Sequence, residues 1–285
     1  MQSVAIVGVG LIGGSFGLAL RAAGFEGRIV GVSSERTIEQ AITLGAIDRG
    51  VTLEIAAAEY DLIYLAQPIS AIERTLQLLG PIATSACLIT DAGSTKVKIV
   101  QTARITVRTS QFLGGHPMAG KESRGVASAS ADLFRGRPYV LTPSHVDDLR
   151  TPLASGFIKW LERCGAHIVT VSPELHDRAV AFTSHLPQMA STALTVSLAN
   201  ALQNEDHLRM AGPGLSDMSR LALSSYEIWR DIIATNTENI EHALNVYIDK
   251  LTDLRDNLQT QRLGDVFAKA TEIATLIRRQ NNVKS

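Results

Sequence analysis

Three short clusters in this chain hold the residues that are best suited to chemistry. They read Asp91-Ala92-Gly93-Ser94-Thr95-Lys96, Gly114-Gly115-His116-Pro117-Met118-Ala119-Gly120 and Ser184-His185-Leu186-Pro187-Gln188. His116 stands between two glycines and a proline, where a rigid exposed turn favours function over core packing. Because histidine titrates at about pH 6.5, it is mostly neutral at cytoplasmic pH and ready to accept a proton. The clusters therefore indicate proton-transfer chemistry.

A glycine-rich motif near the start of the chain predicts a site for a dinucleotide. Gly8-Val9-Gly10-Leu11-Ile12-Gly13 follows a predicted strand and opens a predicted helix. Gly8 would allow the tight turn, Gly10 would let the backbone approach a pyrophosphate, and Gly13 would let helix and strand pack closely. The pyrophosphate would lie at the amides and the positive dipole end of the helix, next to Leu11 and Ile12. In this strand–turn–helix context, a dinucleotide site is preferred to a structural glycine turn.

The residues after the second predicted strand bear on which cofactor binds. Sites for NAD usually place Asp or Glu about 20 residues beyond the last glycine of the motif. This chain has Ser33 there, followed by Ser34, Glu35 and Arg36. Hydroxyls and an arginine suit a 2′-phosphate better than a bare hydroxyl, which favours NADP over NAD. NAD stays open because Glu35 could be a displaced acidic partner, while Ser34 could cap a helix and Arg36 could lie in solvent.

Short apolar runs alternate with helix-like stretches in the first half, which predicts a doubly wound α/β sheet of the Rossmann type. The predicted strands are residues 4–9, 28–32, 62–66, 87–90 and 112–115, with 139–142 and 167–171 as further candidates. The predicted helices are residues 11–23, 37–44, 69–79, 95–102 and 152–163. Ligands of such sheets bind beyond the carboxyl ends of the strands. Gln67 and Pro68, which follow the third strand, are therefore assigned to the cofactor site.

Glycine divides the chain into two parts of different composition. Nineteen of the 22 glycines precede Ser172 and three follow it. Since helix interiors exclude glycine, we predict an all-α second domain, residues 173–285, after an α/β domain of residues 1–172. Within it, apolar residues recur at spacings of four and three, as in a helix packed against another helix: Ile240, Leu244, Tyr247, Leu251, Leu254 and Leu258. The partner helix could belong to this chain or to a second subunit.

The composition excludes several classes of protein. Hydrophobic residues make up 45% of the 285 residues and charged residues 19%, which excludes a disordered chain. The formal net charge of −1, without a long run of like charges, argues against nucleic-acid or membrane-surface binding. Cys87 and Cys164 lack metal-ligand spacing and are expected to be buried free thiols. The glycine-rich apolar N-terminus has no basic flank, so a cytoplasmic protein without a signal peptide is expected.

Five motifs together resemble the prephenate/arogenate (cyclohexadienyl) dehydrogenase family of tyrosine biosynthesis. They are GVGLIGGS near the start, DAGSTK, GGHPMAG followed by Glu122, SHLP, and the stretch GLSDMSR…WRDI. They occur in order between residues 3 and 232. The resemblance implies oxidative decarboxylation of prephenate or arogenate to 4-hydroxyphenylpyruvate or tyrosine, with hydride passing from C4 to the nicotinamide. It also implies that residues 173–285 bind substrate and form a homodimer.

The resemblance assigns roles to five residues of these motifs. His116 matches the catalytic histidine that takes the proton of the C4 hydroxyl, and Ser94 matches the serine that contacts both. Arg220 matches an arginine that binds a substrate carboxylate, although a surface salt bridge is the plain alternative. His185 matches a histidine that contacts the substrate side chain. Gln188 stands where many relatives that use prephenate have histidine, so the choice between a keto and an amino side chain stays open.

Two alternative functions are kept beside this one. A β-hydroxyacid dehydrogenase or imine reductase shares the two-part architecture, but the former is expected to use a lysine at the start of the helical domain. Residues 173–188 contain no lysine. A non-catalytic dinucleotide-binding relative would keep the glycine turns, yet the candidate residues for catalysis and substrate binding are all in place. Trp229 and Arg230 could close the site or simply pack a helix.

Overall fold

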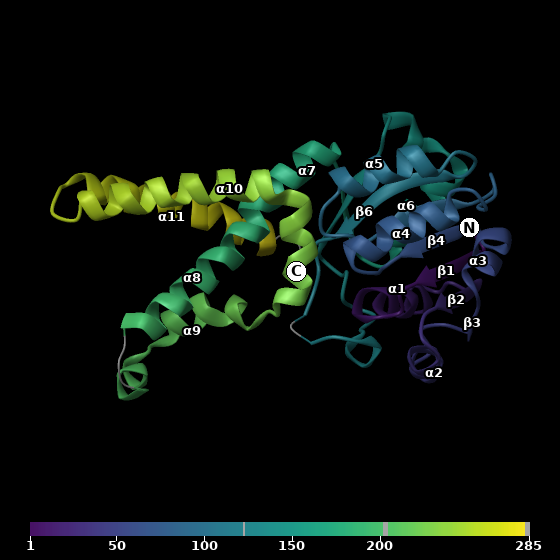
Figure 1. The fold of residues 1–285 in the computed structure, drawn as a ribbon, viewed down its shortest axis with the longest axis horizontal. Helices are drawn as coiled ribbons and strands as arrows, with labels where there is room; N and C mark the ends of the chain where they lie inside the picture. The colour runs from purple at the N-terminus through teal and green to yellow at the C-terminus, as the bar shows by residue number, and fades with distance from the viewer. Residues whose placement is uncertain (122, 202–204, 283–285) are drawn as a thin grey trace.

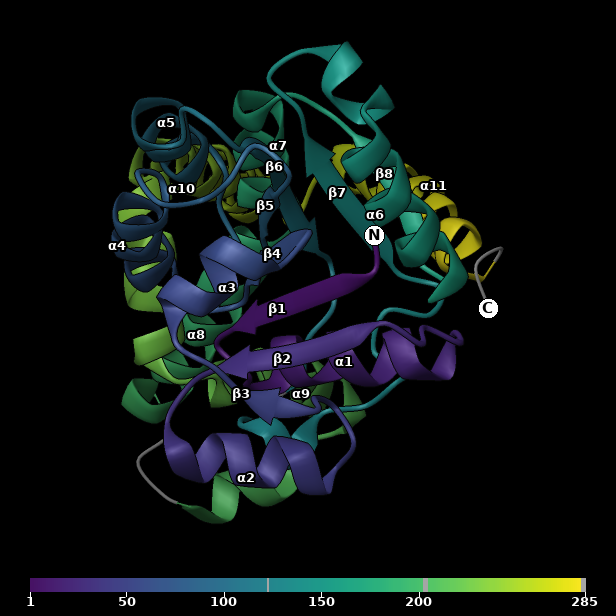
Figure 2. The ribbon, with the colours of Figure 1, turned by 90° about the vertical axis from the view of Figure 1, so that its right-hand side faces the viewer.

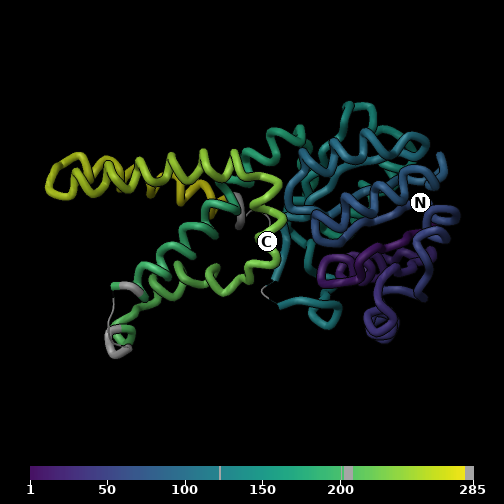
Figure 3. The backbone as a smooth tube through the Cα atoms, viewed as in Figure 1, coloured from purple at the N-terminus to yellow at the C-terminus, as the bar shows by residue number. Residues whose placement is uncertain are grey.

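A computed structural model describes residues 1–121, 123–201 and 205–282 of the chain. It has two parts: a sheet covered by helices on both faces, and a set of helices that extends away from it (Figure 1, Figure 3). The prediction of a Rossmann-type α/β part followed by an all-α part is confirmed.

One sheet of eight strands forms the centre of the first part, counted over the described residues. The strands are β1 (Ser3–Val7), β2 (Arg28–Val32), β3 (Arg49–Gly50), β4 (Leu62–Leu65), β5 (Leu88–Asp91), β6 (Gln111–Pro117), β7 (Pro138–Thr142) and β8 (His167–Thr170). Their order is β3-β2-β1-β4-β5-β6-β7-β8, and β6 with β7 is the antiparallel pair. The order reverses between β1 and β4, and open α/β sheets bind ligands in the crevice at such a reversal.

The strand register brings the predicted site loops to one edge of the sheet. Val7 at the end of β1 is paired with Val32 on one side and with Leu65 on the other. Leu65 is paired in turn with Asp91 at the end of β5. The loops that follow these four strands therefore open side by side. The glycine motif and the Asp91 cluster are neighbours for this reason.

Six helices flank the sheet and five form the second part, again counted over the described residues. The first six are α1 (Leu11–Ala22), α2 (Glu35–Thr43), α3 (Leu53–Glu59), α4 (Ile69–Leu79), α5 (Val97–Thr106) and α6 (Pro152–Arg163). The others are α7 (Pro173–Val180), α8 (Leu186–Ala201), α9 (Pro213–Ser219), α10 (Tyr226–Asp256) and α11 (Arg262–Asn282). The short elements β3 and α3 were not predicted from the sequence. The helix predicted at residues 95–102 begins two residues before α5 and ends four residues before its end.

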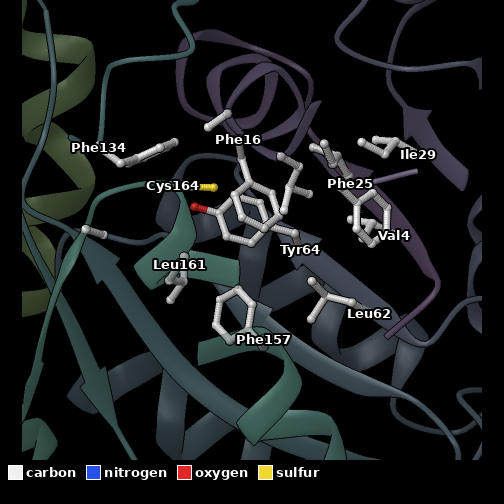
Figure 4. Close-up of a cluster of buried hydrophobic side chains, with 14 of the residues drawn as sticks. Val4, Phe16, Phe25, Ile29, Leu62, Tyr64, Phe134, Phe157, Leu161 and Cys164 are labelled. Carbon is white, nitrogen blue, oxygen red and sulfur yellow. The ribbon is translucent and has the colours of Figure 1, made fainter. Parts of the chain in front are cut away.

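The central strands β1 and β4 are buried along their whole length because both faces of the sheet are covered there. All five residues of β1 are buried, as expected for a parallel strand between two layers of helices. One face packs against α1 and α6, and the other against α3, α4 and α5 (Figure 2). On the first face Phe16 stacks on Tyr64 with ring centroids 4.1 Å apart, among the side chains of Figure 4. This double core holds the carboxyl edge of the sheet in place.

Two irregular turns interrupt the helices of the second part. A π-helical turn, Ala181–His185, joins α7 to α8. Asn236 has non-helical backbone angles, φ −137° and ψ 25°, inside α10. Such interruptions often occur at functional sites because they redirect side chains. His185 lines the site described below, and Asn236 forms a hydrogen bond with His185.

The predicted apolar stripe on α10 is only partly covered within this chain. Ile240 is buried, whereas Leu251 is 46% exposed and Leu258, beyond the end of α10, is 66% exposed. Helix α11 also exposes large apolar side chains, namely Phe267, Ile273, Leu276 and Ile277. In the described residues no helix is both long and apolar enough to cross a membrane. Cys87 and Cys164 are buried free thiols, as predicted.

Candidate active site

Two neighbouring cavities lie where the carboxyl edge of the sheet meets α10. The first, called the crevice, has a volume of about 390 Å³ and is lined by Gln67 and Pro68 after β4. The second, called the histidine cavity, has a volume of about 580 Å³ and is lined by His116 and His185. The two cavities share the following lining residues: Leu11, Ile12, Ser94, Lys121, Ile228 and Ile232. A ligand in the crevice would therefore reach the wall of the histidine cavity.

The glycine loop has the backbone shape that a dinucleotide requires. Gly8 has φ +90°, and a Cβ there would lie 2.7 Å from Cγ of Gln67. A Cβ on Gly13 would collide with the carbonyl oxygen of Gly8, which explains the close packing of α1 on β1. A Cβ on Gly10 would meet no atom within 4 Å, so the open space at the start of α1 is available to a ligand. These residues fit a pyrophosphate at the helix N-terminus.

The candidate residues for the ribose lie apart from both cavities, after β2. Ser33, Ser34 and Arg36 are all exposed. Ser34 is the N-cap residue of α2, and its hydroxyl forms a 2.9 Å hydrogen bond with the hydroxyl of Thr37. Arg36 lies in the first turn of α2, which follows β2. The last residue of β2, Val32, accepts a hydrogen bond from the backbone amide of Gly8. This position suits the far end of a dinucleotide whose pyrophosphate lies at α1.

The histidine cavity brings together all five residues that the motifs assign to catalysis and substrate binding. Ser94, His116, His185, Gln188 and Arg220 line it. They come from the loop after β5, from β6, from the π-helical turn, from α8 and from the residue after α9. Side chains separated by up to 126 positions in the sequence thus face one space.

His116 is neutral in this environment. Burial, then the neighbouring His176, Lys96 and His185, lower the pKa of His116 well below its ordinary value. Its Nδ1 lies 2.8 Å from Nε2 of His176. An imidazole that is unprotonated at neutral pH and lines a cavity can act as a general base.

His185 is also neutral, and its tautomer is set by α10. Burial lowers the pKa of His185 to about 4. Nδ2 of Asn236 lies 3.2 Å from Nδ1 of His185, so the amide donates and the ring nitrogen accepts. The ring therefore carries its proton on Nε2, which makes it a hydrogen-bond donor. The ring of Trp229 stands edge-on at 5.7 Å and also lines the cavity.

Gln188 and Arg220 occupy the side of the cavity formed by the helical part. Nε2 of Gln188 donates to the carbonyl oxygen of Leu221 at 2.9 Å and to the hydroxyl of Thr192 at 3.2 Å. Both amide hydrogens are thereby used, which leaves Oε1 as the remaining group for hydrogen bonding. Arg220 is exposed at the start of a short 3-10 turn, Arg220–Leu223. Its planar guanidinium suits a carboxylate.

A group of buried polar residues next to His116, namely His176, Asp177 and Asn236, was not predicted from the sequence. Nδ1 of His176 lies 2.7 Å from a carboxylate oxygen of Asp177, and both side chains are almost fully buried. Asn236 donates to the backbone oxygen of Asp177 at 2.8 Å. The available signal was a His–Asp pair in the helix that leads to SHLP, but the spacing alone does not aim it at His116.

A buried ion pair supports the loops from the sheet side. Lys96 and Asp91 are both fully buried and form a salt bridge. Asp91 also accepts hydrogen bonds from the backbone of Gly93 at 2.8 Å and Gly115 at 3.1 Å. Lys96 donates to the carbonyl oxygen of Gly115 at 2.7 Å. The pair thus ties the loop after β5 to β6 and holds Ser94 and His116 in register.

Two carboxylates of the helical part cap helices of the sheet part. Asp177 accepts hydrogen bonds from the backbone amides of Lys96 at 2.7 Å and Val97 at 2.9 Å, at the start of α5. Asp231 accepts one from the backbone amide of Ser70 at 2.9 Å, in the first turn of α4. Anionic groups at helix N-termini are favourable. The two parts are therefore fastened together beside the cavities.

Two further sequence-based candidates have different outcomes. Trp229 lies in the site, with Nε1 donating to the hydroxyl of Ser224 at 3.0 Å. Arg230 instead points to Asp231, with which it forms a salt bridge of 3.3 Å. Glu122 lies outside the described residues.

Comparisons with known families agree with this architecture. The family "Prephenate dehydrogenase, nucleotide-binding domain" matches residues 16–170, and "Prephenate dehydrogenase, dimerization domain" matches residues 172–281. The chain is 33% identical to prephenate dehydrogenase of Bacillus subtilis over 278 residues, which cover 93% of this chain and 72% of the relative.

Solved structures extend the similarity over nearly the whole fold. Prephenate dehydrogenase from Aquifex aeolicus, in complex with hydroxyphenyl propionate and NAD+, is 32% identical with a TM-score of 0.87 and covers 98% of both chains. Arogenate dehydrogenase from Synechocystis is 31% identical with a TM-score of 0.80, covering 96% of this chain and 99% of the other. This chain therefore belongs to the prephenate/arogenate dehydrogenase family of nicotinamide-dependent oxidoreductases.

Proposed function

We propose that this chain catalyses the NAD(P)-dependent oxidative decarboxylation of a cyclohexadienyl substrate, prephenate or arogenate. The observation that carries the proposal is the histidine cavity, where Ser94, His116, His185, Gln188 and Arg220 meet beside the glycine loop. The product would be 4-hydroxyphenylpyruvate from prephenate and tyrosine from arogenate. A nicotinamide cofactor would be held by Gly8, Gly10 and Gly13 with Gln67 and Pro68, and when bound it supplies the hydride acceptor.

His116 would act as the base. It accepts the proton of the C4 hydroxyl as hydride leaves C4, which requires the neutral imidazole that burial favours here. Loss of the ring carboxylate as CO2 then returns its electron pair to the ring, which becomes aromatic, and the phenolate oxygen recovers a proton. Ser94 would orient the C4 hydroxyl, and Arg220 would pair with a substrate carboxylate through its planar fork.

Gln188 supports arogenate as the preferred substrate. Because both amide hydrogens of Gln188 are used within the protein, its oxygen is the group left to meet a ligand. A carbonyl oxygen accepts hydrogen bonds, so it suits the ammonium group of arogenate and not the keto oxygen of prephenate. The neutral His185 would offer its Nε2 proton to a carboxylate of either substrate.

Steady-state rates with prephenate and arogenate, each with NAD and NADP, test the function and the substrate preference together. We expect kcat/KM to be higher for arogenate, and Gln188→His to shift the ratio toward prephenate by at least ~10-fold, which corresponds to about 1.4 kcal/mol. Gln77→His, at an exposed position of α4, is the matched control. A wild-type preference for prephenate would overturn the Gln188 argument, and no turnover in any mixture would favour a non-catalytic relative.

We also propose that NADP is preferred to NAD. Ser33, Ser34 and Arg36 present hydroxyls and a guanidinium to the expected ribose position, although the related Aquifex protein was crystallised with NAD+. Arg36→Ala should lower kcat/KM for NADP about 10-fold or more and change that for NAD little, because a 2′-phosphate loses a charged hydrogen bond. Arg74→Ala, on the exposed side of α4, serves as control. An equal loss with both cofactors would count against a 2′-phosphate contact.

The functional division of the chain follows from the same proposal. Residues 1–172 would bind the cofactor, and residues 173–285 would complete the substrate site and form a homodimer. The uncovered apolar side chains of α10 and α11 support this assembly, since exposed apolar surface of this extent marks an interface. Two buried free thiols suit a reducing, cytoplasmic location.

A further inference from the structure

We propose that His176, held by Asp177, is a positioning residue that selects the tautomer of His116 and aims its basic nitrogen at the substrate. The inference rests on the proposed role of His116 and adds two residues to it. Asp177, His176 and His116 form a continuous row: Oδ1 of Asp177 lies 2.7 Å from Nδ1 of His176, and Nε2 of His176 lies 2.8 Å from Nδ1 of His116. His176 is 2% exposed and Asp177 is 1% exposed.

The direction of each hydrogen bond follows from the far end of the row. The carboxylate of Asp177 already accepts hydrogen bonds from the backbone amides of Lys96 and Val97. An ionised carboxylate only accepts, so Nδ1 of His176 must be the donor. A neutral imidazole has one proton, which leaves Nε2 of His176 as an acceptor. Nδ1 of His116 must then donate, and Nε2 of His116 carries the free lone pair.

The charges around the row favour the neutral form of both rings. Burial is the main effect that lowers the pKa of His176, while its hydrogen bond to Asp177 opposes this. The groups that face the two rings are Lys96 and Asp91 from the sheet side, Asp177 on α7, and His185 on the π-helical turn. Lys96 is paired with Asp91, so its charge is balanced. The row runs from an acceptor end, the carboxylate of Asp177, to a basic end, Nε2 of His116. Because Nδ1 of His116 is used by His176, the basic end, Nε2, is the ring nitrogen left for a ligand in the histidine cavity that His116 lines.

The row also links the base to the contact between the two parts of the chain. Asp177 comes from the helical part, and the amides it binds belong to α5 of the sheet part. His116 stands on β6 of the sheet part, so its orientation depends on α7 being docked. The proposed base on the sheet therefore receives its positioning hydrogen bond from α7 of the helical part.

A pair of variants separates positioning from simple packing. His176→Phe keeps a ring but removes the nitrogen that accepts a hydrogen bond from Nδ1 of His116. His116 can then take the tautomer that carries its proton on Nε2. We expect kcat to fall by roughly 10²-fold or more, as wrong tautomers do in histidine-dependent catalysis, with KM changed less than about 3-fold. His176→Gln can accept from His116 through Oε1 and donate to Asp177 through Nε2, and it should recover most of kcat. Equal, full activity of both variants would overturn the proposal.

A spectroscopic measurement tests the same point without turnover. Nitrogen NMR of the full-length protein with labelled histidine, using His116→Gln to assign the signals, reports which ring nitrogen is protonated. At neutral pH we expect the proton of His116 on Nδ1 in the wild type and a mixture of tautomers in His176→Phe. A proton on Nε2 in the wild type would overturn the inference, even if the protein proved inactive on every substrate tested. The wild-type spectrum keeps the test decisive if His176→Phe does not fold.

Discussion

His116→Ala is expected to lower kcat by at least ~10²-fold while cofactor affinity stays unchanged, because the variant removes a general base and not a binding group. The side chain lines the histidine cavity but belongs to neither the glycine loop nor the residues after β2. The effect should therefore appear in the chemical step. The measurement is steady-state turnover of arogenate and prephenate, with cofactor binding followed by titration of protein fluorescence.

The pH profile of the wild type gives the same assignment a second test. Since the pKa of His116 lies well below its ordinary value, the base remains unprotonated as the pH falls from 8 toward 6.5. Activity should then be lost only when the pH passes through the lowered pKa. His167→Ala, at an exposed position on β8, is the control and should match the wild type. Near-normal turnover by His116→Ala would contradict the assignment of His116 as the general base.

Lys96→Met is expected to give the largest loss of stability, about 3–5 kcal/mol in the free energy of unfolding. Both partners of the Lys96–Asp91 pair are fully buried, so removing the ammonium leaves an uncompensated carboxylate inside the protein. Urea denaturation followed by circular dichroism measures the loss. Activity should fall as well, because the pair joins the Ser94 loop to the strand of His116.

Two further variants isolate the cause of that loss. Asp91→Asn combined with Lys96→Met removes both charges of the pair and keeps one oxygen acceptor, which can serve the amide of Gly93 or that of Gly115, so part of the stability should return. Arg135→Met breaks an ion pair whose side chains are 74% and 70% exposed, and it should cost less than about 1 kcal/mol. A Lys96→Met loss as small as that of Arg135→Met would show that the charge pair is not needed.

The centre of the sheet was predictable because its strands, such as β1, β4 and β5, are buried on both faces. A continuous apolar run such as residues 4–7 or 62–65 has one stable environment in a protein of this size, the centre of a layered sheet. The two-residue strand β3 lacks such a run and was missed. The start of α5 was placed at residue 95, although the helix begins at Val97, because its cap is the carboxylate of Asp177, 80 residues away.

The chemistry of the site divides in the same way between sequence and tertiary structure. The sequence by itself determined the glycine loop, the polar clusters at the strand ends and the family, since these depend on residue types at short spacing. The row from Asp177 through His176 to His116, the orientation of Gln188 and the tautomer of His185 were decided only by the tertiary structure. Hydrogen-bond direction depends on which donors and acceptors meet in space, and here the partners lie 33 to 60 positions apart in three of the four contacts.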